Sequence, residues 1–196
     1  MATVKRVTIT KDTVSKVIGA ITDMVGRQVL VGVPESTTDN TKDRAPGPNN
    51  ASLAFVHEFG SPIRNIPARP FLIPGVEKAK PAALDQLKKA AQAALEFKKE
   101  EVTSRLNKAG LIGMLAAKDK IMNGPFVPLS PKTVRNRRFS RNTQSMRAAE
   151  QKYLKLVAGG MAPGDAEDAA GIRPLINTGA LRDSITYVVR KRGWNT

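Results

Sequence analysis

The sequence predicts an α+β fold in which a small, mostly antiparallel sheet packs against a long α-helix, with extra short helices and long loops. Two short segments, 28–33 and 185–190, have the patterns of strands and lie far apart in the chain. The stretch from about 76 to 122 has helical spacing, whereas 35–50 and 158–172 show neither pattern and are expected to be loops. All 196 residues are expected to belong to one domain.

The N-terminal part is expected to contain two strands and a helix. Residues 7–9 alternate apolar and polar side chains, whereas 28–33, QVLVGV, is apolar on both faces apart from a glycine, as in a central strand. Between them, a helix capped by Asp12 or Thr13 should run to Met24. Its apolar residues at helical spacing are Val14, Val17, Ile18 and Ile21.

A polar segment and a proline-rich segment follow. Residues 35–50 contain no apolar side chain larger than alanine or proline, so we expect a mobile arm that orders only against a partner. A short helix over 50–59 should end at Gly60 as its C-cap. We call residues 57–74 the proline strap, because its four prolines fix φ and remove backbone donors, which makes an extended segment stiff.

The helical stretch 76–122 would span roughly 65–70 Å at about 1.5 Å per residue if it were unbroken. That length exceeds the diameter of a small domain. We therefore expect either that Gly110 and Gly113 break the helix, or that the helix projects and packs against a neighbouring subunit. Its apolar stripe consists of Leu84, Leu87, Ala91, Leu95, Val102 and Leu106.

The C-terminal part begins with a basic helical segment, 131–157, which is expected to hold one helix from Pro131 and a second over 144–157. Ser130 is the candidate cap of the first helix, with Pro131 at its first position. The Gly-, Ala- and Asp-rich loop 158–172 follows. In the last strand, the residues expected on one face are Ile185, Tyr187 and Val189, opposite Thr186, Val188 and Arg190.

Composition restricts the class of protein. The formal net charge is +15, and basic residues become more frequent toward the C-terminus, which favours an anionic partner, either nucleic acid or an acidic protein surface. The chain has no cysteine, no apolar run near the roughly 18 residues of a membrane span and no signal-peptide pattern. We therefore expect a soluble protein of a reducing cytoplasm, without membrane contact.

Residues suited to catalysis are sparse, and we expect no enzymatic activity, cofactor or metal site. His57 is the only histidine, and Ser61 stands where a zinc-protease helix that begins at His57 would need its second histidine. A hydrolase with His57 as its base is the remaining enzymatic alternative, but the sequence contains no Gly-x-Ser-x-Gly elbow. We interpret His57 as a residue near the last carbonyl groups of a helix.

The run 132–141 is the best candidate for nucleic-acid contact, because lysine and arginine bind phosphate. Its basic residues are Lys132, Arg135, Arg137, Arg138 and Arg141. Phe139 is its only aromatic residue, so a base-stacking platform is not indicated. A basic protein that contacts DNA through 132–155 is the alternative, and contact with acidic protein is favoured.

Two motifs carry a resemblance to known proteins. The proline strap, HEFGSPIRNIPARPFLIP, resembles the signature of neck and tail-completion proteins of tailed bacteriophages, in which a His-Glu-Phe-Gly corner and Pro-Ala-Arg-Pro-Phe-Leu precede a long helix. The second motif joins VPLSPKT (127–133) with PLINTGALRDSI (174–185) and is similar to the Mu-like virion morphogenesis (tail completion) family. Phe126 departs from that pattern, which often has tryptophan there. Together the motifs extend over roughly 52–189.

The resemblance implies a structural virion protein of the phage head-tail junction, made in the host cytoplasm and assembled as an oligomeric ring that joins the tail to the capsid connector. The implied partners are further copies of the chain and other neck, connector and tail-tube proteins, with packaged DNA as an additional contact. It does not separate a tail completion role from that of a tail terminator of related fold.

The resemblance also assigns expected roles to residues. Those expected at subunit or partner interfaces are Phe59, Arg64, Pro67, Arg69 and Phe71, with the five basic residues of 132–141. Those expected to shape the motifs are His57, Gly60, Pro70, Leu175, Thr178, Gly179, Leu181 and Ile185. Phe71, Leu175 and Leu181 are expected to pack within the subunit, whereas Arg69 is expected to form an ion pair at an interface. Asn177 or Thr178 should cap a short helix.

Overall fold

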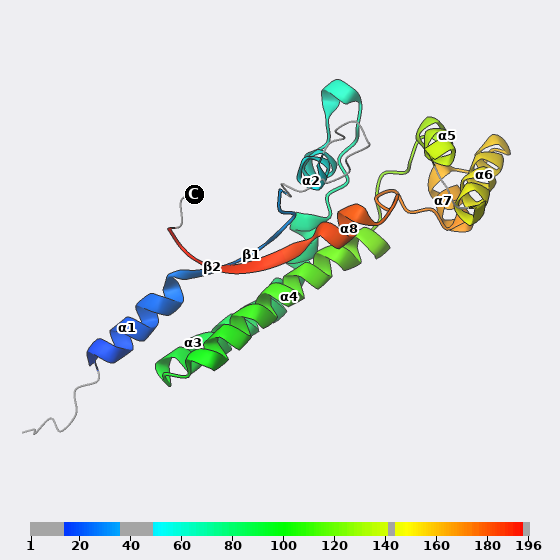
Figure 1. Ribbon diagram of the computed structural model, residues 1–196. Coiled ribbons are helices and arrows are strands. Elements are labelled where there is room, and N and C mark those ends of the chain that lie inside the picture. The colour runs from blue at the N-terminus through cyan, green and yellow to red at the C-terminus, as the bar shows by residue number, and fades with distance from the viewer. Residues whose placement is uncertain (1–13, 36–48, 141–143, 194–196) are drawn as a thin grey trace, which may run out of the picture.

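Two antiparallel helices form the long axis of the molecule, and the other elements are attached along them (Figure 1). In the computed structural model, which describes residues 14–35, 49–140 and 144–193, helix α3 (Leu72–Leu95) turns back into helix α4 (Lys99–Asn123). The described strands form one small antiparallel sheet. Helices and sheet together make an α+β fold, as the sequence predicted.

The prediction of one long helix over about 76–122 is wrong, because the chain reverses at Phe97. Phe97 has a φ of 60°, in the left-handed region, and its N–H donates to the carbonyl of Ala94 at 3.0 Å, which closes α3. The reversal brings small side chains of α3 against apolar side chains of α4. The buried residues at this contact are Ala90, Ala93, Ala94, Val102 and Leu106. The hairpin therefore removes from water an alanine face that a single projecting helix would expose.

Gly110 and Gly113 do not break α4, because they lie where the sheet approaches the helix. A Cβ atom on Gly110 would lie 2.3 Å from Cδ2 of Tyr187, and one on Gly113 would lie 3.0 Å from Cγ2 of Val31. A side chain at Gly110 would overlap the Tyr187 ring, and one at Gly113 would press on Val31. The two glycines therefore permit close approach of helix and sheet instead of ending the helix.

The sheet pairs β1 (Arg27–Gly32) with β2 (Thr186–Lys191). The alternation expected in β2 is present, since Tyr187 faces α4 and Val188 is exposed. The prediction that 28–33 is buried on both faces is wrong. Leu30 lies opposite Val188 in the register and is exposed as well. Burial of both faces needs a layer on each side, and within the described residues only the side toward α4 is covered.

The other elements lie beside the hairpin and the sheet. Helix α1 (Val14–Val25) precedes β1, α2 (Asn50–Phe59) and the short 3-10 helix η1 (Pro62–Arg64) precede α3, and α8 (Ala180–Ser184) leads into β2. Three further helices cluster at one end of the molecule, at the right of Figure 1. They are α5 (Pro131–Ser140), α6 (Gln144–Ala158) and α7 (Pro163–Ala170).

The two helices expected in 131–157 are therefore present, and Ser130 caps the first of them by accepting a hydrogen bond from the Thr133 N–H at 3.2 Å. The prediction that 158–172 is a loop is partly wrong, because this segment contains α7, whose Ala166 is buried in the core of the cluster. The predicted strand at 7–9, the caps at 12–13, most of the loop 35–50 and Arg141 lie outside the described residues. None of the described helices is long and apolar enough to cross a membrane.

Gly75 and Gly19 offer a matched test of the hairpin contact. A Cβ on Gly75 of α3 would lie 2.7 Å from the Cα of Ala117, whereas nothing lies within 4 Å of the same position on Gly19 of α1. We expect Gly75→Ala to lower the free energy of unfolding by about 2 kcal/mol, because the two helices must separate. Gly19→Ala should raise it by about 0.5 kcal/mol through helix propensity. Urea denaturation measures both values, and equal effects would contradict the close contact.

Candidate functional site

Glu58, the residue after the only histidine, holds the first turn of α3. Its side-chain oxygens accept hydrogen bonds from the N–H groups of Phe71 (2.8 Å), Leu72 (2.9 Å) and Ile73 (3.0 Å). A helix begins with four N–H groups that lack a partner within the helix. The fourth position here is Pro74, which has no N–H. One buried side chain and one proline therefore account for the whole N-terminus of α3.

The proline strap reaches this position by doubling back on itself. Helix α2 ends at Gly60, the predicted C-cap, whose φ of 77° and close approach to Ala68 require glycine. Ser61 and Ile66 then exchange two backbone hydrogen bonds, of 2.8 and 2.9 Å, around η1. The Arg69 N–H returns to the carbonyl of His57 at 2.6 Å. The strap is thus a closed loop that presents Phe71 beside the end of α2.

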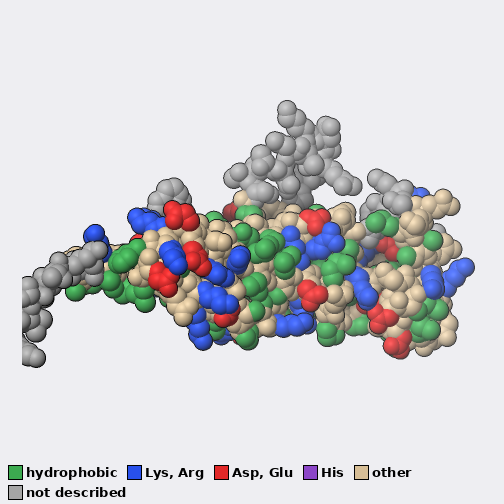
Figure 2. Space-filling view, turned by 90° about the horizontal axis from the view of Figure 1, so that it is seen from below, with side chains coloured by type: hydrophobic (Ala, Val, Ile, Leu, Met, Phe, Trp, Pro, Cys, Tyr) green, Lys and Arg blue, Asp and Glu red, His purple; other side chains and the backbone are tan. Residues whose placement is uncertain are grey.

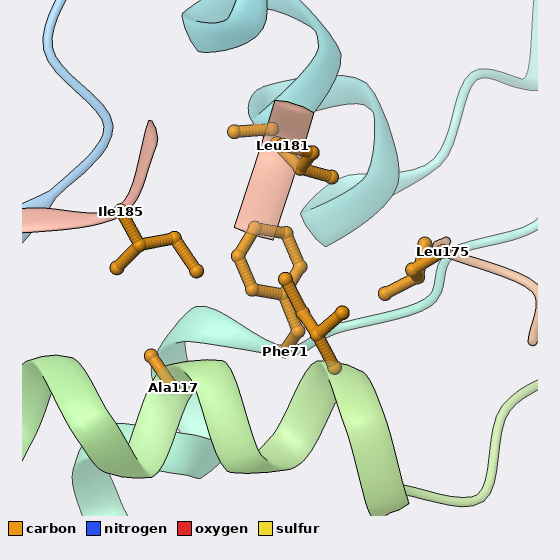
Figure 3. Close-up of a cluster of buried hydrophobic side chains, with 7 residues drawn as sticks. Phe71, Ala117, Leu175, Leu181 and Ile185 are labelled. Carbon is orange, nitrogen blue, oxygen red and sulfur yellow. The ribbon is translucent and has the colours of Figure 1, made fainter. Parts of the chain in front are cut away.

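Phe71 is 0% exposed and lies at the centre of a core cluster to which both sequence motifs contribute (Figure 3). In Figure 3 its ring lies among Leu175, Leu181 and Ile185, above Ala117 of α4. Packing within the subunit, which was expected for Phe71, Leu175 and Leu181, is therefore present. The prediction that Phe71 also lies at an interface is wrong, because its ring has no exposed surface left for a partner. The two motifs, about a hundred residues apart in sequence, form one buried unit.

Arg69 does not form the expected interfacial ion pair. Its guanidinium is buried and donates to two backbone carbonyls of the same chain, those of Val127 (2.7 Å) and Pro128 (3.0 Å). An arginine fork suits two neighbouring carbonyl oxygens as well as it suits a carboxylate. The physical reason for the error is that the segment 125–130 passes directly beside the strap, a contact that local sequence does not reveal. Pro70, next to Arg69, is exposed.

The same segment is held from its other side by the helical cluster. The Leu129 N–H donates to Glu167 of α7, and the Leu129 carbonyl accepts a hydrogen bond of 2.6 Å from the Tyr153 hydroxyl of α6. Burial raises the pKa of Glu167, with opposing contributions from the Leu129 hydrogen bond and from Arg69. Burial also raises the pKa of Tyr153. Residues 127–129 therefore connect the hairpin to the cluster through buried polar contacts.

His57 lies near the end of α2, as interpreted from the sequence. Its Nδ1 is buried without a hydrogen-bond partner among the described residues. Burial lowers the pKa of His57, and Arg69 and Arg137 lower it further. Glu58, its neighbour, is already occupied by three backbone donors. Among the described residues, no group of three or more His, Asp or Glu side chains gathers to hold a metal ion.

Several apolar side chains near the strap point outward. Phe55 and Phe59 of α2 contact each other with ring centroids 5.0 Å apart and are both exposed, and Ile63 at the tip of η1 is 100% exposed. Arg64 beside it is exposed too. We call Phe55, Phe59, Ile63 and Arg64 the α2 knob. Pro67, also named from the sequence, is exposed next to the knob.

The basic residues of 132–141 divide into two groups. Lys132 and Arg135 are exposed on α5. Arg137 instead donates to the backbone carbonyls of Arg173 and Pro174, and so ties α5 to the C-terminal motif. The side chain of Arg138, like Arg141, lies outside the described part of the chain.

The prediction that Asn177 or Thr178 is the cap of the short helix in the C-terminal motif is wrong, because the N-cap of α8 is Gly179. Gly179 has a φ of 86° and precedes α8, and the Thr178 hydroxyl oxygen accepts a hydrogen bond of 3.3 Å from the Ala180 N–H. Leu181 and Ile185 then enter the core on either side of α8. The turn therefore directs the chain from the core cluster into β2.

Sequence reasoning missed three features of this region: the role of Glu58, the exposed pair of Phe55 and Ile63, and the polar contacts of Tyr153 and Glu167. The signal for Glu58 was a carboxylate shortly before a helix whose own start, Phe-Leu-Ile-Pro, offers no capping side chain. No local pattern distinguishes the buried Phe71 from the exposed Phe55, because that depends on which face each helix turns toward the hairpin.

Comparison with known proteins assigns no family: no protein-family model matches the chain, and no characterised protein or solved structure matches it significantly.

Glu58→Ala tests the interaction on which the strap depends. We expect it to lower the free energy of unfolding by about 3 kcal/mol, because three donors at the start of α3 lose their acceptor. Glu58→Gln should lower it by less, since one carbonyl oxygen remains. Glu77→Ala removes an exposed carboxyl from the same helix and should change it by no more than about 0.5 kcal/mol. Urea denaturation with far-UV circular dichroism measures all three, and a Glu58→Ala value equal to that of Glu77→Ala would contradict this role.

Proposed function

We propose that this chain is a structural protein of the head-tail junction of a tailed bacteriophage, where copies assemble into an oligomeric ring that joins tail and capsid connector. The proposal rests on the resemblance of two motifs and on what the fold does with them. The motifs are compatible with a tail completion role and with that of a tail terminator of related fold, and in either role the protein acts by assembly, without catalysis.

The observation that carries the proposal is the meeting of both motifs around Phe71. Glu58, Phe71, Leu181 and Ile185 come from the two motif segments and stabilise one another. If the motifs belonged to a catalytic site, their polar side chains would converge on a cavity. Here Glu58 and Arg69 are instead used up by backbone groups of the same chain. Such use of the motif residues is expected of a scaffold that presents surfaces to partners.

The α2 knob is an exposed apolar surface on a backbone that hydrogen bonds hold in place. Phe59 and Ile63 are exposed while the backbone behind them is closed by the Ser61–Ile66 pair and by Gly60. A rigid apolar surface loses little conformational entropy on binding. We assign the knob to contact with a neighbouring neck, connector or tail-tube protein, with Arg64 as its charged group.

A phage whose genome encodes this chain provides the test. Loss of the gene should leave filled heads and separate tails, because the junction cannot be completed, and the wild-type chain supplied in trans should restore joined particles. Ile63→Glu with Phe59→Glu should fail to restore them, whereas Leu111→Glu, at an exposed position on α4, should succeed. Electron microscopy of the particles and infectivity titres measure this. Normal joined, infectious particles that lack the chain would refute the proposed function.

The alternative is that the chain contacts DNA through α5 and α6. The observation that favours it is the exposure of Lys132 and Arg135 on α5, on a chain with a net charge of +15. DNA binding and assembly at the head-tail junction are different classes of function. A junction protein that lies next to packaged DNA would have both.

Duplex binding at several salt concentrations tests the alternative. If α5 contacts phosphates, Lys132→Glu with Arg135→Glu should weaken binding and reduce the slope of log affinity against log salt by about 2. Lys88→Glu with Lys108→Glu makes the same change in net charge on exposed positions of the hairpin and should leave the slope unchanged. Equal effects of the two pairs would show only general attraction between a basic protein and DNA.

A further inference from the structure

Helix α1 exposes an apolar stripe although it is attached to the hairpin. Its residues recur at intervals of four, three and four, so they lie on one face of the helix. They are Val14, Ile18, Ile21 and Val25, with exposed fractions between 44% and 63%. No residue of α1 is buried, although Met24, at the edge of this face, contacts the core of the hairpin. We call these four residues the α1 stripe.

The α1 stripe differs from the other exposed apolar surfaces in carrying no charge. Its flanking positions are Ser15 and Thr22 on one side and Val17 and Met24 on the other. On the hairpin, by contrast, exposed leucines are interspersed with lysines, and Figure 2 shows this mixture on the face turned away from the sheet. An apolar, uncharged surface is rare on a chain with a net charge of +15.

The outer face of the sheet is a second exposed apolar surface. Leu30 and Val188 are paired in the register and have exposed fractions of 38% and 49%. On one side of this pair lie Gly32 and Thr186, which have small side chains, and on the other side lie Gln28 and the exposed Arg190. Sheets are covered on each apolar face by another layer, and a helix is the usual cover. Within the described residues this face has no cover.

The α1 stripe cannot cover the sheet of its own chain. Only Gly26 separates the end of α1 from the start of β1, so α1 continues away from the sheet (Figure 1). A helix that folded back onto its own strand would need a longer connection. The dimensions nevertheless match, because twelve residues of helix extend about 18 Å and six residues of strand extend about 20 Å.

We propose that the α1 stripe of one copy covers the outer face of the sheet, at Leu30 and Val188, of a second copy of this chain. The contact deepens the proposed function, since it names the surface through which copies meet in the ring. It uses two different surfaces of the same chain. Repeated head to tail, such a contact gives a ring where the rotation between copies closes, and a reciprocal pair gives a two-fold dimer.

The charges favour a second copy over other occupants. Two copies carry the same net charge and repel each other wherever lysine and arginine surfaces meet. The α1 stripe carries no charge and can therefore meet the sheet face, which has Arg190 as its one charged residue, without repulsion between like charges. An acidic protein would gain more from the basic α5 and hairpin surfaces. A helix that binds membranes usually has lysine and arginine on its polar face, whereas α1 has one of each sign, Lys16 and Asp23.

Sedimentation velocity of the purified full chain over a range of concentrations tests the contact. We expect reversible association that strengthens as salt screens the repulsion between copies. Ile18→Glu with Ile21→Glu, and separately Val188→Glu, should raise the dissociation constant at least about tenfold. Leu111→Glu with Leu115→Glu makes the same charge change as the α1 pair on exposed positions of α4 and should not raise it. Ile18→Gln with Ile21→Gln repeats the test without a charge change, and circular dichroism checks that α1 stays helical.

Cross-linking identifies the surface of the second copy, because the natural chain has no cysteine. A chain with Ile21→Cys is mixed with a differently tagged chain with Val188→Cys and treated with a short bis-maleimide. A mixed product is expected, and the control mixture of Leu111→Cys with Val188→Cys should give none. A product formed only between two Ile21→Cys chains would overturn the proposal, since α1 would then pair with α1.

Three further results would overturn the proposed contact between the α1 stripe and the sheet of a second copy. A monomer at every concentration, or binding of the α1 stripe to phosphatidylcholine vesicles instead of to a second copy, would overturn the inference. Equal weakening by the α4 control pair would do the same. Sedimentation and cross-linking use only the purified chain, so they test the contact between copies independently of any role in the phage particle. Association through α1 by a chain that is absent from joined particles would refute the function and leave this inference intact.

Discussion

The capture of the first turn of α3 by Glu58 is the interaction on which the rest of this structure depends. Three N–H groups that would otherwise lack partners are bound by one buried side chain from the end of α2. This fixes α2 against α3 and places the Phe71 ring beside the hairpin. Leu181 and Ile185 then have a surface on which to pack, and β2 leaves the core in the direction that pairs it with β1.

Small residues set the second constraint, because they decide how closely the layers approach. The alanines of α3, together with Gly75, let the two long helices come together, and Gly110 and Gly113 let the sheet lie on α4. Close contact of small side chains buries little apolar area per residue. The molecule is consequently elongated. In the part of the chain that the structure describes, the buried apolar side chains are divided among three separate clusters, and many other apolar side chains remain exposed. Such a subunit has more to gain from neighbours than a chain with one large core.

Local rules predicted several elements well. Gly60 ends α2, Ser130 and Pro131 begin α5, and the alternation around Tyr187 gives the inward face of β2, because each depends on residues within one turn or one strand. The long helix over 76–122 failed for a different reason. Its apolar pattern continues across Phe97, so nothing local distinguishes one helix from a hairpin. Arg69 failed similarly, since its two acceptor carbonyls are almost sixty residues away.

By itself the sequence determined the fold class, the ends of several helices, the motifs and the charge, because these follow from residue types and short-range spacing. Only the tertiary structure decided which of those residues are used within the chain and which are left for a partner. Glu58, Arg69 and Phe71 are buried by contacts with distant segments, whereas Ile63 and the α1 stripe remain exposed. The physical reason is that burial depends on which surfaces come together in three dimensions, and side chains of the same type are equally apolar or polar before the chain folds.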